Sequence, residues 1–285
     1  MADQLEWRQI EPFGAEVVGV DLSQAPPQAI LNQLRQLYDQ HHLLVFRGQK
    51  LTLEQQRSAA GWFGKLYPPA EGVNFISNTR KDGYLGNLEL KFHSDLAHCE
   101  YPIESVMLLG VELDEGNTST KFVSSAKAWA ELPDDLKKVV ENRRAVQCFA
   151  YGPTEGVYGF DERLPNWSHR IARPHPRTGE LCLYVMPEST RVIEDMPEEE
   201  GRPLLEALYE HIARPEAVYE HIWHVGDVVL WDNLACQHAR GALNPDVPRT
   251  MQRATLGPLT FKQQYPSLSP EAQEIVFGRL GAEPG

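Results

Sequence analysis

The second half of the chain is a succession of short strand-like segments separated by glycine, proline, asparagine and aspartate. Three of these segments are Leu181–Val185, Val228–Trp231 and Arg249–Leu256. Many short strands with turn residues between them are typical of a β-sandwich or a β-barrel. The sequence therefore predicts a mainly β core.

Amphipathic helical patterns lie before and between these strands. Apolar residues recur with a period of about 3.6 over Gln28–His41, and Glu198–Ala213 carries a similar apolar stripe, so each segment is expected to form a helix with one buried face. Thr52 is a suitable N-cap for another helix, which runs toward Phe63. Asp134–Asn142 is expected to form a surface helix. These helices would flank the β core and give an α+β fold.

Length, charge and cysteine usage narrow the class of protein. The 285 residues, 42% of them hydrophobic, suffice for a sizeable core, and the four cysteines lie far apart with no Cys-x-x-Cys pair. A formal net charge of −13 argues against sequence-independent binding to nucleic acid and against binding to an anionic membrane. No apolar run reaches the length of a membrane span, and the first residues lack a basic start and an apolar segment. We therefore expect one domain over residues 1–285 and a soluble, acidic, cytoplasmic protein of the size of an enzyme.

A His-x-Asp motif at His93 and Asp95 is the first candidate metal site. The segment Leu90–Leu96 is expected to form a strand or the end of one, where side chains at positions i and i+2 share a face. An imidazole and a carboxylate that project together into a barrel supply two ligands for a divalent metal, and a second histidine completes a 2-His-1-carboxylate facial triad. His238, after the strand Val228–Trp231, is the candidate. By itself the motif is weak, because a hydrogen-bonded surface pair gives the same pattern.

Two arginines in the last predicted strand strengthen this interpretation. Alternation places Arg249, Met251 and Arg253 on one face. If that face is the barrel interior, two guanidinium groups point inward, and a buried cation needs a neutralising partner. No acidic residue lies next to them, and they are about 13 Å apart along an extended strand. The pattern therefore predicts two separate carboxylate or sulfonate ligands. The alternative is a solvent-exposed strand that leaves Met251 in water.

Further segments carry a resemblance to a known family. They are Phe13–Leu22, His42–Arg47, the Gln55–Gln56 pair with Phe63–Gly64, the stretch Arg173–Arg191 and the stretch Gly226–His238. Arg249 follows His238 by 11 positions, which also fits that family. With these segments the chain resembles, over nearly its whole length, the Fe(II)/2-oxoglutarate-dependent dioxygenases of the taurine dioxygenase and 2,4-dichlorophenoxyacetate dioxygenase type.

The resemblance implies a double-stranded β-helix, the cupin-like jelly-roll barrel, flanked by α-helices. It implies that His93, Asp95 and His238 hold Fe(II) and form the catalytic centre. It further implies that Thr118 and Arg249 bind the distal carboxylate of the cosubstrate 2-oxoglutarate. The side chains that it places around the primary substrate are those of Arg253, Tyr184 and Trp231. Asn87, in the loop before the His-x-Asp motif, is a further candidate for binding the substrate.

The implied reaction consumes O2 and 2-oxoglutarate, releases succinate and CO2, and oxidises a C–H bond of a small anionic substrate. Related halogenases lack the carboxylate that Asp95 supplies, so hydroxylation is favoured over halogenation, while desaturation or another oxidative outcome stays open. After Phe63–Leu66 the chain lacks the histidine that helps to hold taurine, and the loop Asn78–Leu90 also differs. Taurine itself is therefore not the expected substrate. The dimers and tetramers of related enzymes imply a homo-oligomer.

Two alternatives use part of the same pattern. A non-catalytic barrel that binds a metal and an organic acid, as a sensor or storage module, would not need both Arg249 and an intact triad. A zinc hydrolase would accept His93, Asp95 and His238 as ligands, but the arginines and Thr118 would then have no purpose. Fe(II) and 2-oxoglutarate distinguish these possibilities, because only a dioxygenase forms the coloured chelate and then yields succinate with O2.

Overall fold

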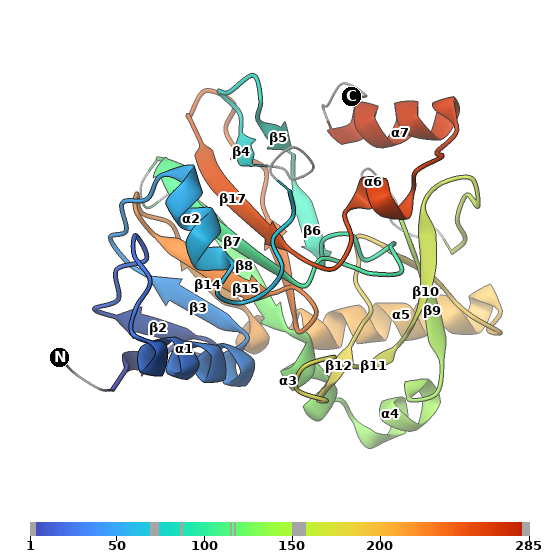
Figure 1. The fold of residues 1–285 in the computed structure, drawn as a ribbon. Helices are drawn as coiled ribbons and strands as arrows, with labels where there is room; N and C mark the ends of the chain where they lie inside the picture. Colours follow the sequence, from blue (N-terminus) through green and yellow to red (C-terminus); the bar gives the residue numbers. More distant parts are fainter. Residues whose placement is uncertain are drawn as a thin grey trace.

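The computed structural model describes residues 4–68, 74–85, 88–114, 116, 118–149 and 158–280. Figure 1 shows strands from both halves of the chain in a common β core, with helices on its outside. Because the strands of this core come from distant parts of the sequence, residues near positions 93 and 238 meet within it.

An eight-stranded sheet forms one wall of the core. Its strands, in spatial order, are β1 (Glu6–Gln9), β2 (Ala15–Val18), β3 (Leu43–Phe46), β15 (Val228–Asp232), β7 (Ser105–Glu112), β17 (Thr250–Leu256), β4 (Phe75–Ser77) and β5 (Tyr84–Leu85). Neighbouring strands are antiparallel except for the pairs β2–β3 and β4–β5. The expected strand at the end of the chain thus begins at Thr250, one residue after Arg249.

A four-stranded sheet forms the facing wall. Its strands, in spatial order, are β14 (Tyr219–Ile222), β8 (Ser119–Ser124), β16 (Cys236–Arg240) and β6 (Leu90–His93). All its pairs are antiparallel, and the register of β16 on β6 sets His238 opposite His93. These two sheets are the walls of the jelly roll that the sequence predicts.

Apolar side chains pack between the two sheets. In β3, Leu43 and Val45 belong to this inner cluster, while Leu44 and Phe46 belong to the cluster on the outer face of the large sheet. Because both faces of this strand are buried, its sequence is apolar at every position rather than alternating. In β17, Met251 lies in the inner cluster, as the alternation in the sequence predicts.

Two helices cover the outer face of the large sheet (Figure 1). They are α1 (Gln28–His41) and α2 (Leu53–Ala60). The predicted helix over Gln28–His41 is confirmed to the residue, and α2 begins after Thr52 in a reciprocal capping box with Gln55. Two such bonds satisfy orphan backbone donors at the helix start.

The remaining elements form a second layer beside the barrel. The helices are α3 (Ser125–Ala130), α4 (Asp134–Val140), α5 (Glu198–Ile212), α6 (Phe261–Gln264) and α7 (Pro270–Leu280), with a 3-10 turn at Pro215–Ala217. The strands are β9 (Arg144–Cys148), β10 (Asn166–Arg170), β11 (Ala172–Pro174), β12 (Leu181–Leu183) and β13 (Thr190–Ile193). The predicted helices at residues 134–142 and 198–213 are thereby confirmed as α4 and α5, each slightly shorter than expected.

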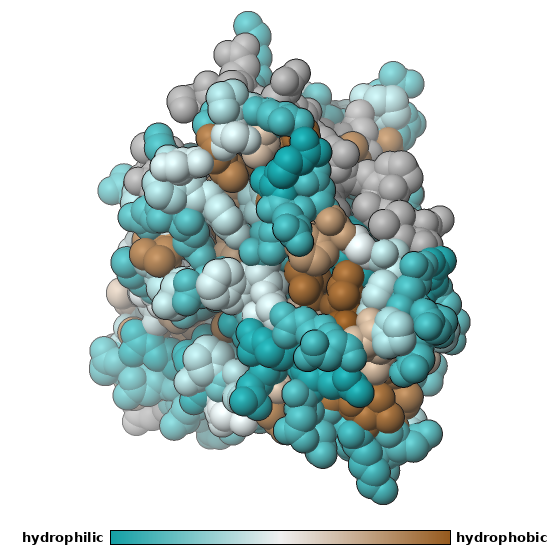
Figure 2. All heavy atoms as spheres, turned by 90° about the vertical axis from the view of Figure 1, so that its right-hand side faces the viewer, coloured by the Kyte–Doolittle hydropathy of each residue, from teal (hydrophilic) through white to brown (hydrophobic). Residues whose placement is uncertain are grey.

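The surface is mostly polar, in keeping with the composition. On the face that Figure 2 shows, hydrophilic side chains predominate and separate the apolar patches from one another. None of the helices in the described part of the chain combines the length and the apolar character that a membrane crossing requires.

Leu208 on α5 provides a test of the packing in the second layer. Its side chain is fully buried in the cluster between α5 and strands β9 and β13. Leu208→Ala is expected to lower the free energy of unfolding by about 2–5 kcal/mol, because it removes buried methyl groups and leaves a cavity. Val139→Ala, at a position on α4 that is 44% exposed, should change it by less than about 0.5 kcal/mol. Urea denaturation measures both, and equal effects would contradict this packing.

Candidate metal and cosubstrate site

Two histidines lie opposite each other on neighbouring strands of the small sheet. His93 is the last residue of β6 and His238 lies in β16, and their rings are 4.1 Å apart between centroids. Nδ1 of His93 lies 2.7 Å from the carbonyl oxygen of Lys91. With its hydrogen donated to that carbonyl, Nδ1 fixes the tautomer in which Nε2 is free to bind a metal.

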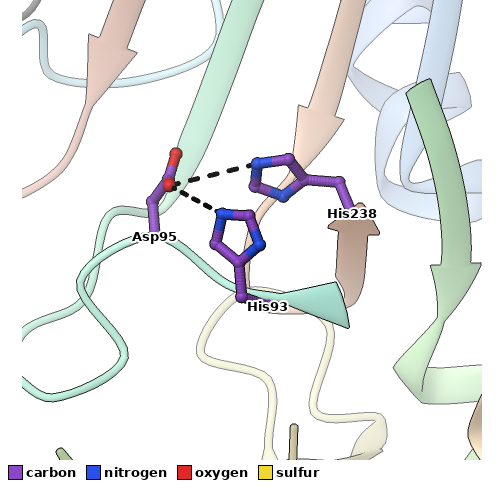
Figure 3. Close-up of side chains that lie close together, drawn as sticks. All are labelled: His93, Asp95 and His238. Carbon is purple, nitrogen blue, oxygen red and sulfur yellow. Dashed lines mark ion pairs between the residues drawn. The ribbon is translucent and has the colours of Figure 1, made fainter. Parts of the chain in front are cut away.

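Asp95 completes the cluster from outside the strand. Its Oδ1 lies 3.5 Å from Nε2 of His93 and 4.0 Å from Nε2 of His238 (Figure 3). One ligand atom from each of the three residues lies within 4.8 Å of the other two. Because β6 ends at His93 and Leu96 adopts a positive φ of 54°, a turn rather than strand alternation brings the carboxylate to the histidines.

The backbone of Asp95 is held by Asn233, a residue to which the sequence analysis gave no role. The Asn233 side chain accepts a hydrogen bond from the Asp95 backbone N–H at 2.9 Å and donates to the Asp95 carbonyl at 3.1 Å and to the Ile103 carbonyl at 2.8 Å. Only its position at the end of the strand Val228–Asp232 hints at this role, since residues at strand ends often carry function in barrel folds.

Asn233→Ala is expected to weaken divalent-metal binding by about 10–100-fold, because the partners that orient metal ligands typically contribute that much. The matched control is Asn166→Ala in β10, which removes a hydrogen bond from the Asn166 side chain to the Leu164 carbonyl. Titration with Co(II), followed by its visible absorbance, measures the affinity of each variant. Wild-type affinity in Asn233→Ala would show that the Asp95 turn holds its geometry without this side chain.

The charge states of the three side chains suit a cation. Although burial opposes ionisation of Asp95, Arg253 and the two histidines hold the pKa of its carboxyl far below the usual range. Burial and the neighbouring His93 lower the pKa of His238 to about 3, so this imidazole is neutral. Burial lowers the pKa of His93, but Asp95 and the Lys91 carbonyl outweigh it and leave a net increase. Metal binding therefore competes with a proton at His93.

Arg253 is the other partner of Asp95. Its NH2 group donates a hydrogen bond to Asp95 Oδ2 at 2.6 Å, and both side chains are largely buried. No acidic residue lies next to Arg253 in the sequence, but the fold supplies one, Asp95, from 158 positions away along the chain. A local scan of the sequence for acidic neighbours could not find that partner.

Arg249 stands in contrast to Arg253. It is only 4% exposed, and its Nε and NH1 make no hydrogen bond within the described part of the chain. Burial, together with the positive charge of Arg240, lowers the pKa of Arg249 to about 9. A buried guanidinium without a partner is costly, so this position is suited to an anion.

Arg240 is a third arginine of this region, in addition to Arg249 and Arg253, and the sequence analysis gave it no role. It lies two residues after His238 on β16, and its side chain donates to the carbonyls of Leu85 and Leu88. Burial lowers the pKa of Arg240 to about 10. Its position two residues after a predicted metal ligand, on the same strand, is the signal in the sequence that could have found it.

The other expected site residues are placed in different ways. Thr118 is buried just before β8, and its carbonyl accepts a hydrogen bond from the Trp223 backbone. Trp231 packs directly beside the metal cluster, with its ring centroid 4.8 Å from that of His238. The Tyr184 ring instead contacts Arg173, at 4.5 Å, and lies 5.2 Å from His169. Asn87 lies outside the described residues.

The turn between β15 and β16 is built on a buried carboxylate. Asp232 accepts hydrogen bonds from the backbone of Leu234 and Ala235, and from the side chains of His175 and Arg177. Although burial raises the pKa of Asp232, the hydrogen bond and charge of His175 lower it to about 2 overall. This network fixes the path of the chain from Trp231 to His238.

Comparison with known proteins agrees with this arrangement. The family model "Taurine catabolism dioxygenase TauD, TfdA family" matches residues 6–255. An alpha-ketoglutarate-dependent 2,4-dichlorophenoxyacetate dioxygenase from Cupriavidus pinatubonensis is 30% identical over 270 residues, which cover 85% of this chain and 94% of that protein. An alkylsulfatase from Acinetobacter baylyi is 29% identical over 89% of this chain and 85% of its own length.

Solved structures give the same result for the fold. The crystal structure of AAD-2 in complex with Mn(II) and N-oxalylglycine has a TM-score of 0.78 and 29% sequence identity, and the match covers 90% of this chain and 98% of that one. These matches extend over nearly the whole length of each relative. The chain therefore belongs to the taurine catabolism dioxygenase TauD/TfdA family, and it is an oxidoreductase that depends on Fe(II), 2-oxoglutarate and O2.

Proposed function

We propose that His93, Asp95 and His238 hold the Fe(II) of this dioxygenase. The single observation that carries the proposal is the convergence of two imidazole nitrogens and one carboxylate oxygen within 4.8 Å of one another. Two histidines and one carboxylate on one side of the ion are the donor set of non-haem Fe(II) oxygenases, and they leave the other positions open. The ionised Asp95 and the neutral His238 are already in the protonation states that a metal requires.

We infer that Arg249 binds the distal carboxylate of 2-oxoglutarate, with Thr118 as a second donor to the same group. The Nε and NH1 atoms of Arg249, which have no partner among the described residues, support this assignment, because they need an acceptor and burial has removed water as an alternative. The planar fork of arginine suits a carboxylate, with two parallel N–H···O bonds. The role of Thr118 rests on the family resemblance and on its burial.

When bound, Fe(II) and 2-oxoglutarate supply the activation of O2 and the oxidation of a C–H bond, with release of succinate and CO2. The side chains of the barrel orient these reactants. Arg249 fixes the far end of the cosubstrate, and the tautomer set by Lys91 directs Nε2 of His93 toward the cluster. Trp231 and Phe122 pack on the ring of His238 and exclude water from that side of the site. Their contribution is orientation and a dry environment.

We propose that the primary substrate is a small anionic organic molecule whose C–H bond is hydroxylated. Arg253 is the candidate anchor for its anionic group, because within the described chain only NH2 of its guanidinium is engaged by a carboxylate. Trp231 would contact the apolar body, and we assign the same role to Tyr184 on the resemblance alone. Asn87 is a further candidate for binding the substrate. Relatives named for 2,4-dichlorophenoxyacetate and for sulfate esters agree with an anionic substrate.

The domain organisation, the cellular compartment and the oligomeric state are also proposals. We infer that residues 1–285 form one catalytic domain, because β15 and β17 from the C-terminal part complete the sheet that β2 and β3 begin. Four buried free cysteines are consistent with the reducing cytoplasm. A dimer or tetramer is the expected assembly on the family resemblance, and light scattering coupled to size exclusion determines it.

The test of the proposed function has two stages. Anaerobic addition of Fe(II) and 2-oxoglutarate should produce the visible charge-transfer band of the chelate, and admission of O2 should then yield succinate. A panel of phenoxyacids, sulfate esters, sulfonates and short carboxylic acids is screened for stimulated succinate formation, with Zn(II)-loaded protein as the inactive control. Stimulation by an uncharged analogue rather than by any acid would contradict the substrate class. Absence of both band and succinate would overturn the assignment of the site.

A further inference from the structure

Asp95 is the only one of the three proposed ligands that no strand positions. His93 and His238 are fixed by the register between β6 and β16, whereas Asp95 lies two residues beyond the end of β6. Asn233 holds its backbone, but a fixed backbone still leaves the carboxylate free to rotate. Something else must orient the two carboxylate oxygens.

Arg253 makes the contact that orients them. It donates from NH2 to Oδ2 at 2.6 Å, a short distance for a charge-assisted hydrogen bond, while Oδ1 is the oxygen that faces His93 and His238. Arg253 comes from the middle of β17 in the opposite sheet, where it is registered against Leu108 of β7. Because β17 is paired on both sides, the guanidinium is delivered from a rigid element.

We propose that Arg253 is a positioning residue that restricts Asp95 to one metal-binding oxygen. A carboxylate can bind a metal through one oxygen or through two. With Oδ2 engaged by Arg253, only Oδ1 is available, so Asp95 occupies one coordination position and leaves the others for cosubstrate and O2. This inference rests on the proposed role of Asp95 as a ligand, and it gives Arg253 a function besides that of substrate anchor.

The two roles of Arg253 make different predictions. An arginine that served only as a substrate anchor would affect substrate affinity and leave metal binding unchanged. An arginine whose charge merely repelled the metal would, once removed, make metal binding tighter. A positioning arginine does neither, because its loss frees the carboxylate and weakens metal binding. Metal affinity in the absence of substrate and cosubstrate therefore separates the three cases.

The test is a Co(II) titration of the full chain, without 2-oxoglutarate, followed by the visible absorbance of the bound ion. We expect Arg253→Met to weaken binding by about 10–100-fold, as for other residues that orient metal ligands. We also expect a changed absorbance band, because a second oxygen of Asp95 can then reach the metal. Arg253→Lys retains a donor for Oδ2 and should recover most of the affinity.

Arg47→Met is the matched control, because Arg47 donates a hydrogen bond of the same length, 2.6 Å, to a carboxylate, that of Asp227, which is not part of the metal cluster. It should bind Co(II) with wild-type affinity and spectrum. Wild-type affinity and spectrum in Arg253→Met, or tighter binding, would overturn the inference. If Arg253→Met does not fold, as judged by circular dichroism, then Arg253→Gln is titrated against Arg253→Lys, and equal affinities overturn it. Failure of the wild-type chain to bind Co(II) would instead refute the proposed metal site.

Discussion

His238→Ala is expected to abolish succinate formation and to weaken divalent-metal binding by well over 100-fold. Residues that merely orient a metal ligand contribute about 10–100-fold, so removal of a ligand should cost more. The variant is a clean test because Nδ1 of His238 has no hydrogen-bond partner within the described chain, and its loss leaves the pair of Asp95 and Arg253 intact. Isothermal titration with Mn(II) and a coupled succinate assay measure the two effects.

The control for this variant is His224→Ala. The His224 side chain is 56% exposed, and its Nδ1 lies 3.8 Å from Asp227, which is not part of the metal cluster. It should retain wild-type metal affinity and activity. Turnover by His238→Ala within tenfold of wild type would mean that His238 is not a ligand.

Arg249→Met is expected to raise the Kd for 2-oxoglutarate by roughly 30- to 5,000-fold, while leaving metal binding intact. Loss of one partner of a buried, hydrogen-bonded charge pair costs about 2–5 kcal/mol, which corresponds to that range. Although this variant loses affinity for the cosubstrate, the melting temperature of the unliganded protein should not fall. Because Nε and NH1 of Arg249 are buried and have no partner in the part of the chain that the structure describes, an apolar side chain of similar length should leave the melting temperature unchanged or raise it.

Thermal melts with and without 2-oxoglutarate, in the presence of Mn(II), measure both effects. Wild-type protein should gain stability from the cosubstrate, because a ligand that binds only the folded state raises the melting temperature. Arg249→Met should show little or no gain at the same concentration. A full cosubstrate-induced shift in this variant, or a marked loss of stability without ligand, would show that Arg249 has a structural role and does not hold the cosubstrate.

Local patterns were sufficient to predict four of the helices, α1, α2, α4 and α5, whereas α3, α6 and α7 were not predicted. The segment Gln28–His41 predicted from the 3.6-residue period has the exact bounds of α1, and its buried residues Leu34, Leu37 and Tyr38 pack in the cluster on the outer face of the large sheet. Inward alternation in β17 also holds, with Met251 in the inner cluster and Ala254 in the outer one. These features depend on the apolar periodicity of a short segment, so the sequence of that segment is enough to predict them.

Contacts between distant segments could not be predicted in this way. The pair of Arg253 and Asp95 spans 158 positions, and the hydrogen bonds from Asn233 to Asp95 span 138. Their existence depends on which strands lie side by side, and this topology is set by the packing of the whole barrel. The resemblance to a family supplied part of the missing information, but it assigned Arg253 to the substrate and did not indicate its contact with a metal ligand.

The same limit applies to the path of the chain around the metal cluster. Strand alternation would place Asp95 beside His93 on a continuous strand, yet the strand stops at His93 and a turn follows. That turn is stabilised by Asn233, 138 positions away along the chain, whose side chain also donates a hydrogen bond to the Ile103 carbonyl. The His-x-Asp spacing therefore predicts that His93 and Asp95 belong to one cluster. The contacts that position Asp95 come from distant parts of the chain, so the spacing does not predict them.

The central claim is that His93, Asp95 and His238 hold one metal ion with the cosubstrate carboxylate at Arg249. A crystal structure with Mn(II) and the cosubstrate analogue N-oxalylglycine tests it most directly, with anomalous scattering to locate the ion. We predict one ion bound by Nε2 of both histidines and by Oδ1 of Asp95, and the distal carboxylate of the analogue on the Arg249 guanidinium. An ion located elsewhere, or the analogue bound away from Arg249, would contradict the account.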